Sequence, residues 1–183
     1  MGEIELDGEL LGRYYELASV ERRAEAIEAV GRGLERDGAP PDEAATRLRT
    51  LLERRIEAVR AGGDGEELRG FAWWFESGAL GDDWSLARLR DLLEAGGRIH
   101  PDHVVAAHLA EIRGEHLQTA IELVELLIET GTSTWFVLGA REHISAIVAD
   151  ALAAGGAAEA RARDVVGRLV ARGHPDFAGL LPG

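Results

Sequence analysis

Apolar side chains recur every three to four residues along most of the chain, the spacing that lines one face of an α-helix. In residues 42–61, Leu48, Leu52 and Ile56 fall on one such face. Alternation with a period of two, which would indicate β-strands, does not extend over any useful length. We therefore predict an all-α protein. The expected helices cover 20–36, 42–61, 84–95, 102–113 and 115–130, followed by helices around 144–152 and 165–170.

Glycine follows nearly every apolar-periodic stretch, as at Gly38, Gly78 and Gly173. The position after a helix often takes a left-handed backbone conformation that glycine tolerates best. Gly31 and Gly33 weaken the end of the first predicted helix, because glycine is a poor helix former. At the starts, Ser19 and Asp83 are predicted N-caps. All five prolines lie near proposed helix starts or in the tail, so none interrupts a periodic stretch.

From about residue 66 the predicted helices pair off into units 66–96, 101–130 and 134–172. Paired amphipathic helices at a spacing of roughly 30–40 residues are typical of helical repeats. Residues 1–63 are rich in Arg and Glu and show no matching unit, and the glycine-rich stretch 61–65 is the best candidate boundary. We expect an N-terminal helical cap at 1–63 and a stack of antiparallel helical hairpins at 64–183.

Composition excludes several classes of function. Hydrophobic residues make up 46% of the chain, enough for a sizeable core, but no run of about eighteen uncharged apolar residues exists to span a membrane. The acidic start of the chain does not resemble a signal peptide. The absence of Cys and Lys excludes disulfides, thiolate zinc sites, Schiff bases and a Walker lysine. We expect a cytoplasmic protein without a cofactor.

The formal net charge of −13 is concentrated in the middle of the chain, where residues 64–131 hold fourteen acids and five arginines. Such a segment would repel phosphate backbones, so we expect no direct binding of nucleic acid. It could attract a basic partner, or it could serve solubility alone.

Aromatic residues cluster in the segment 71–84. On a helix, Phe71, Trp74 and Phe75 share one face and are expected in the core, whereas Trp73 points elsewhere. Trp73 either packs against a neighbouring hairpin or offers an exposed anchor of the kind that is common at interfaces. The candidate partner-binding residues are Trp73, Trp84 and Trp135.

The aromatic string 71–78, with Trp84, Leu86 and Leu89, resembles the helical tails of large bacterial multidomain proteins, as do Trp135, Phe136 and the segments 158–172 and 177–181. Those tails are HEAT-like α-solenoids associated with ligand sensing in defence-type ATPases. The resemblance covers residues 66–183 and implies a HEAT-like α-solenoid fragment. This chain contains no ATPase or effector domain, so the resemblance implies a free-standing recognition piece or a subunit of a larger assembly.

Histidine supplies the main hint of an enzyme, because His100, His103, His108 and His116 lie within seventeen residues. Metal sites need imidazoles and carboxylates that converge on one point, but the chain has no HExxH or ExxH pattern. The adjacent pair Glu142–His143 points in two directions on a helix, which disfavours acid–base chemistry. We expect no metal site and no catalytic residues.

Arg161, Arg168 and Arg172 fall near one face of the last predicted helix. They form either a solvated face that complements the helix dipole or a surface that docks onto acidic groups, within the chain or on a partner.

The preferred hypothesis is a non-catalytic protein–protein interaction module that binds its partner through the groove between helical hairpins. One alternative is an acidic decoy that inhibits a basic nucleic-acid-binding protein. Another is a metal-dependent hydrolase built around the histidines of 100–116.

Overall fold

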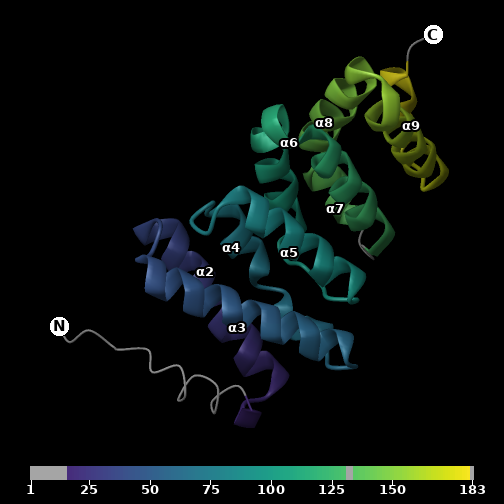
Figure 1. Ribbon diagram of the computed structural model, residues 1–183. Coiled ribbons are helices and arrows are strands. Elements are labelled where there is room, and N and C mark those ends of the chain that lie inside the picture. The colour runs from purple at the N-terminus through teal and green to yellow at the C-terminus, as the bar shows by residue number, and fades with distance from the viewer. Residues whose placement is uncertain (1–15, 131–133, 182–183) are drawn as a thin grey trace.

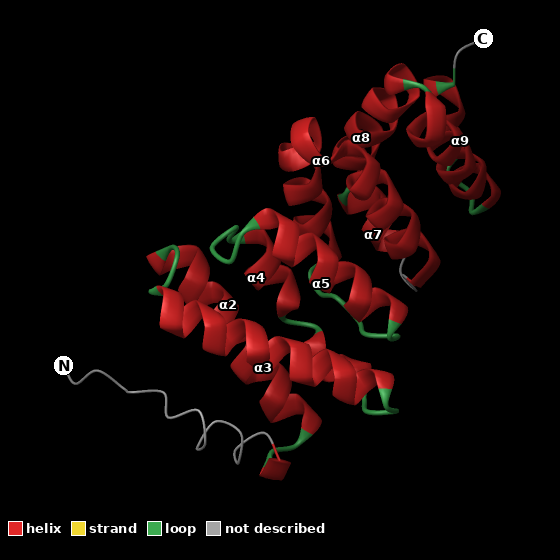
Figure 2. Ribbon diagram, in the orientation of Figure 1, coloured by secondary structure: helices red, strands yellow, loops and turns green. Residues whose placement is uncertain are grey.

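The computed structural model describes residues 16–130 and 134–181, and the side chains of residues 134–136 lie outside the description. Within these ranges every regular element is an α-helix or a 3₁₀-helix and none is a strand, which confirms the predicted all-α fold (Figure 2). None of the described helices combines the length and apolar character that a membrane span requires. The elements of Figure 1 are α2 (Val20–Asp37), α3 (Asp42–Arg60), η1 (Gly65–Leu68), α4 (Phe71–Glu76), α5 (Asp82–Glu94), α6 (Asp102–Thr130), α7 (Thr134–Gly139), α8 (Arg141–Ala154), α9 (Gly156–Ala171) and η2 (Pro175–Leu180).

The ends of the helices follow the local sequence closely. Ser19 caps α2 as predicted, because its Oγ accepts a hydrogen bond of 3.4 Å from the backbone N of Arg22. Gly38 ends α2 with a φ of 79°, a conformation that glycine adopts without steric cost. The predicted cap at Asp83 is wrong. Helix α5 already begins at Asp82 after Gly81, so Asp83 lies in the first turn.

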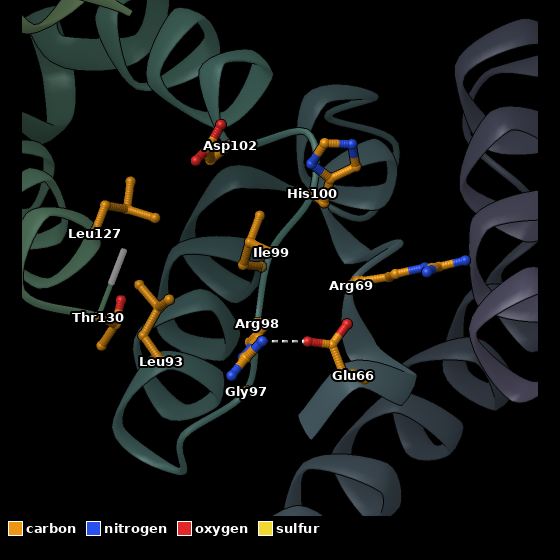
Figure 3. A pocket seen from close by; sticks show the side chains of 10 residues that line it. All are labelled: Glu66, Arg69, Leu93, Gly97, Arg98, Ile99, His100, Asp102, Leu127 and Thr130. Atoms are coloured by element: carbon orange, nitrogen blue, oxygen red, sulfur yellow. Dashed lines mark hydrogen bonds and ion pairs between the residues drawn. The ribbon is translucent and has the colours of Figure 1, made fainter. Parts of the chain in front are cut away.

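The predicted helices 102–113 and 115–130 form the single element α6, which is broken at His116 (φ −124°, ψ 28°) and not at Gly114. A straight helix would place Asp102 and Leu127 roughly 38 Å apart at 1.5 Å per residue. Both residues nevertheless line the same cavity (Figure 3). The chain therefore reverses direction at His116, and the N-terminal half of α6 (102–115) lies beside its C-terminal half (117–130).

A first row of helices consists of α2, α4, the N-terminal half of α6, and α8. Between α2 and α4, the indole Nε1 of Trp74 donates a hydrogen bond of 2.6 Å to the carbonyl of Ile27. Between α6 and α8, Arg113 Nε lies 2.6 Å from Asp150 Oδ2. Arg23 at the start of α2 pairs with Glu67 of η1 at 3.1 Å, and Gly31 later in α2 lies against Trp74 later in α4, so these two helices run in the same direction. The N-terminal half of α6 and α8 do so as well, because His103 lies beside Gly139 just before α8, and Arg113 pairs with Asp150 further along both helices.

A second row consists of α3, α5, the C-terminal half of α6, and α9. Arg49 Nη2 of α3 donates a hydrogen bond of 2.7 Å to the carbonyl of Leu80, which lies just before α5. Further along α3, Ile56 is buried in the core. Near the other end of the same two helices, Arg60 lies 3.5 Å from Asp91. Arg90 of α5 in turn pairs with Glu122 of α6. The order of the first two contacts makes α3 and α5 parallel, and the successive pairs Glu125–Arg161 and Glu129–Arg168 do the same for the C-terminal half of α6 and α9.

One hydrophobic cluster runs through both rows, from Ile27 in α2 to Phe177 in η2. Phe71, Trp74 and Phe75 are buried in it, with exposed fractions of 0%, 1% and 0%, which confirms their prediction as core residues. The cluster continues across the predicted boundary at 61–65. Helices α2 and α9 lie at opposite ends of the molecule, and the helices between them follow in chain order (Figure 1).

Candidate functional site

The main candidate site is a groove on the second row, between α5, the C-terminal half of α6, and α9. Its volume is about 500 Å³, within the range of protein ligand sites. We call it the acidic groove because four glutamates and two arginines line it, together with one apolar side chain. The lining residues are Arg90, Glu94, Glu122, Glu125, Leu126, Glu129 and Arg161.

Ion pairs between helices fix most of the carboxylates of the acidic groove. Glu125 is only 8% exposed, and its two oxygens are bound by Arg168, at 3.1 Å, and by Arg161. Glu122 pairs with Arg90 and also accepts a hydrogen bond of 2.7 Å from the side chain of Gln118. These bonds hold the groove walls in place, so a ligand would meet a preorganised surface.

Glu94 is the exposed carboxylate at the end of α5, and it forms no ion pair with another described residue. It is therefore the groove acid most available to a partner. The sequence could not single it out, because an isolated glutamate near a helix end looks like an ordinary solvated side chain.

A second cavity, of about 270 Å³, lies among the ends of α5 and α6, η1, and the segment 97–100 (Figure 3). Leu93, Ile99 and Leu127 form its apolar side, while Arg98 Nη1 is bound to Glu66 Oε1 at 2.8 Å. Two backbone hydrogen bonds attach the segment to η1 and the residue after it: Arg98 N to Gly65 O at 3.3 Å and His100 N to Arg69 O at 2.9 Å. Its polar groups hold the connection between hairpins together, and the cavity is smaller than most ligand sites.

The predicted partner-binding tryptophans face different neighbours. Trp73 is half-buried on α4, with the guanidinium carbon of Arg32 from α2 at 4.0 Å from its ring centroid. Trp84 is half-buried on α5, and its Nε1 donates a hydrogen bond of 3.0 Å to Glu53 of α3. The side chain of Trp135 lies outside the described residues. Trp73 and Trp84 thus each join two helices, and the structure does not gather them on one surface.

The four histidines of 100–116 do not share one environment, and His103 is exposed at the start of α6. His108 is 8% exposed and lies between Asp82, 3.3 Å from its Nε2, and Glu111, 3.6 Å from its Nδ1. His116 lies 3.8 Å from Asp83, whereas His100 lines the cavity of Figure 3. Over the described residues, no group of three or more His, Asp or Glu side chains is arranged to hold a metal ion. Glu142 and His143 lie in the first turn of α8, where Glu142 is exposed and His143 is half-buried.

Many acids of the middle segment are engaged by arginines. Arg161 and Arg168 of α9, and Arg172 directly after it, all bind the C-terminal half of α6, the last through the carbonyl of Ile128. The predicted basic face of α9 therefore docks within the chain. In the segment 64–131, the carboxylates that pair with arginine are Glu66, Glu67, Asp91, Glu122, Glu125 and Glu129.

Comparison of the chain with models of known protein families, with curated proteins and with solved structures finds no match in any of the three.

Proposed function

We propose that the chain is a HEAT-like α-solenoid of four helical hairpins that binds a protein partner and does not catalyse a reaction. The hairpins are α2/α3, α4/α5, the two halves of α6, and α8/α9. The two parallel rows of helices support this proposal, because repeated hairpins that stack in one register produce such rows. On this proposal the stack begins near residue 20, and α2/α3 is its first hairpin and not a separate cap.

The acidic groove is the proposed partner site, and the observation that carries this assignment is its position across three consecutive hairpins. A groove that follows the second row can accept an extended segment or a helix of another protein. Three of its four glutamates pair with arginines and Glu94 does not, so the segment it fits best places an Arg or Lys beside Glu94. Leu126 adds an apolar side chain to the lining, and apolar contacts are common at the centres of interfaces.

The interhelical ion pairs support a role as a rigid platform. A partner that meets prearranged carboxylates loses less conformational entropy on binding than one that must order them. Arg161 and Arg168 also limit the repulsion among Glu125 and Glu129, which stabilises a concentration of negative charge that would otherwise strain the stack.

The experiment is affinity capture from an extract of the native cells with the wild-type protein and two charge-reversal variants. Glu94→Arg changes the unpaired acid of the groove, and Glu142→Arg makes the same change at an exposed position on α8, outside the groove. We expect a protein that is retained by the wild type and by Glu142→Arg, and that binds Glu94→Arg roughly ten-fold more weakly or worse.

The captured protein should be released when the salt concentration rises from about 0.05 M to about 0.5 M, because screening weakens contacts between exposed charges. Equal capture by all three proteins would refute the groove as the binding site. Failure of the wild type to retain any protein would refute the interaction module itself.

A further inference from the structure

The carboxyl group of Glu76 lies where the first three helices of the first row meet. Glu76 is the last residue of α4 and is half-buried, and its Oε2 atom is inaccessible to solvent and has no hydrogen-bond partner among the described residues. A buried carboxylate oxygen without a donor is unfavourable, because it has lost water without gaining a replacement.

Charged and titratable groups of the two helices beside α4 act on Glu76. Glu35 comes from α2, and His103, His108 and Glu111 come from the N-terminal half of α6. Asp82 of α5 is next to His108, with its Oδ1 at 3.3 Å from the Nε2 of His108. No arginine is among the described groups whose charge acts on Glu76.

The balance of these groups disfavours the ionised form of Glu76. Burial is the largest influence and raises the pKa of Glu76 above its ordinary value, and the negative charge of Glu35 and then that of Glu111 raise it further. His108 and His103 lower the pKa of Glu76 in part, so they offset the effect without cancelling it.

We infer that Glu76 is a proton-sensitive joint between α2, α4 and α6, which packs tightly as the neutral acid and loosens when it ionises. The joint connects three successive hairpins, so its state would alter how the first row stacks. This inference does not depend on partner binding, because it rests on the buried, unpartnered Oε2 of Glu76 and the charges that act on it.

The sign of the effect follows from proton linkage. A carboxyl whose pKa is raised by folding destabilises the fold above its folded pKa, and this destabilisation disappears as the pH falls toward the pKa of the unfolded chain. Replacement by the neutral isostere, Glu76→Gln, should therefore stabilise the protein at neutral pH and have little effect at low pH.

The experiment is thermal unfolding of the full chain between pH 8 and pH 4.5, for the wild type, Glu76→Gln and Glu142→Gln. We expect Glu76→Gln to raise the unfolding midpoint by roughly 2–4 °C at pH 8, and this advantage to fall by more than half at pH 4.5. Glu142→Gln, at an exposed position on α8, should follow the wild type at every pH.

Two further measurements do not depend on how well Glu76→Gln folds. A carbon-13 NMR titration of the wild type should show the Glu76 carboxyl titrating above the ordinary glutamate range, and higher still in His108→Gln. Amide exchange at residues 77–81, corrected for its intrinsic pH dependence, should slow several-fold as Glu76 is protonated. A midpoint difference that is constant with pH, or an ordinary titration of Glu76, would overturn the inference.

Discussion

The close approach of α2 to α4 gives a sharp prediction, because two glycines of α2 that are two residues apart have opposite surroundings. A Cβ atom at Gly31 would lie 2.7 Å from both Trp73 Cβ and Trp74 Cδ1, and 3.0 Å from the backbone N of Trp74. A Cβ atom at Gly33 would meet nothing within 4 Å. We therefore compare Gly31→Ala with Gly33→Ala.

Both substitutions remove a glycine from the same helix, so each gains about 0.8–1 kcal/mol of helix propensity. At Gly31 this gain is opposed by overpacking, which typically costs about 1–3 kcal/mol. The upper part of that range applies because Trp74 cannot move easily. It is 1% exposed, and its indole is bonded to the carbonyl of Ile27.

Gly33→Ala should therefore stabilise the protein by close to 1 kcal/mol, and Gly31→Ala should be less stable than Gly33→Ala by about 2–3 kcal/mol. Urea unfolding followed by tryptophan fluorescence measures both differences, provided that circular dichroism gives the same midpoint. Equal stabilisation by the two variants would show that α2 does not pack against α4 at Gly31.

Substitutions at Glu67, Trp84 and Ser19, two of them with a matched control, test contacts between and within the hairpins by the same unfolding assay. Glu67→Gln removes a charge that is 2% exposed and binds Arg23 and Arg55, and it should lower the free energy of unfolding by about 3 kcal/mol or more. Glu43→Gln, in an exposed ion pair, should lower it by less than about 1 kcal/mol. Similar losses in the two variants would contradict the role of burial. Trp84→Phe keeps an aromatic ring but loses the hydrogen bond to Glu53, and a loss of about 1 kcal/mol is expected, while an unchanged midpoint would speak against that bond. Ser19→Ala should cost about 1 kcal/mol through the lost N-cap, and Ser19→Gly only a few tenths, so equal losses would argue against a capping role.

Local sequence patterns were sufficient for the helices but not for the contacts between them. The ends of α2 and α3 follow from the spacing of apolar residues and from Gly38, which are signals that can be seen within a few residues of sequence. Gly31 was interpreted from sequence as a weakness of α2, because its propensity is visible and its contact with Trp74, more than forty residues away, is not. The predicted break between the helices 102–113 and 115–130 was also at the wrong residue, because Gly114 is helical and the chain reverses at His116.

The candidate site was harder to predict than the fold. Sequence reasoning selected tryptophans because large aromatic residues are common at interfaces, and their role in partner binding stays a prediction. The contacts of Trp73 and Trp84 with neighbouring helices were not visible in the sequence. The acidic groove depends on pairs such as Arg161 and Glu125, whose partners come from different hairpins. No local sequence pattern shows which residues of different hairpins lie side by side, so the groove could be found only from the three-dimensional structure.

The most direct test of the proposed function is photocrosslinking from inside the acidic groove. A photoreactive phenylalanine derivative placed at Glu94 should crosslink to the captured partner, at a segment of the partner that contains Arg or Lys. The same group at Glu142, on α8 and outside the groove, should give little or no crosslink. Crosslinking from Glu142 but not from Glu94 would contradict the assignment of the groove as the partner site.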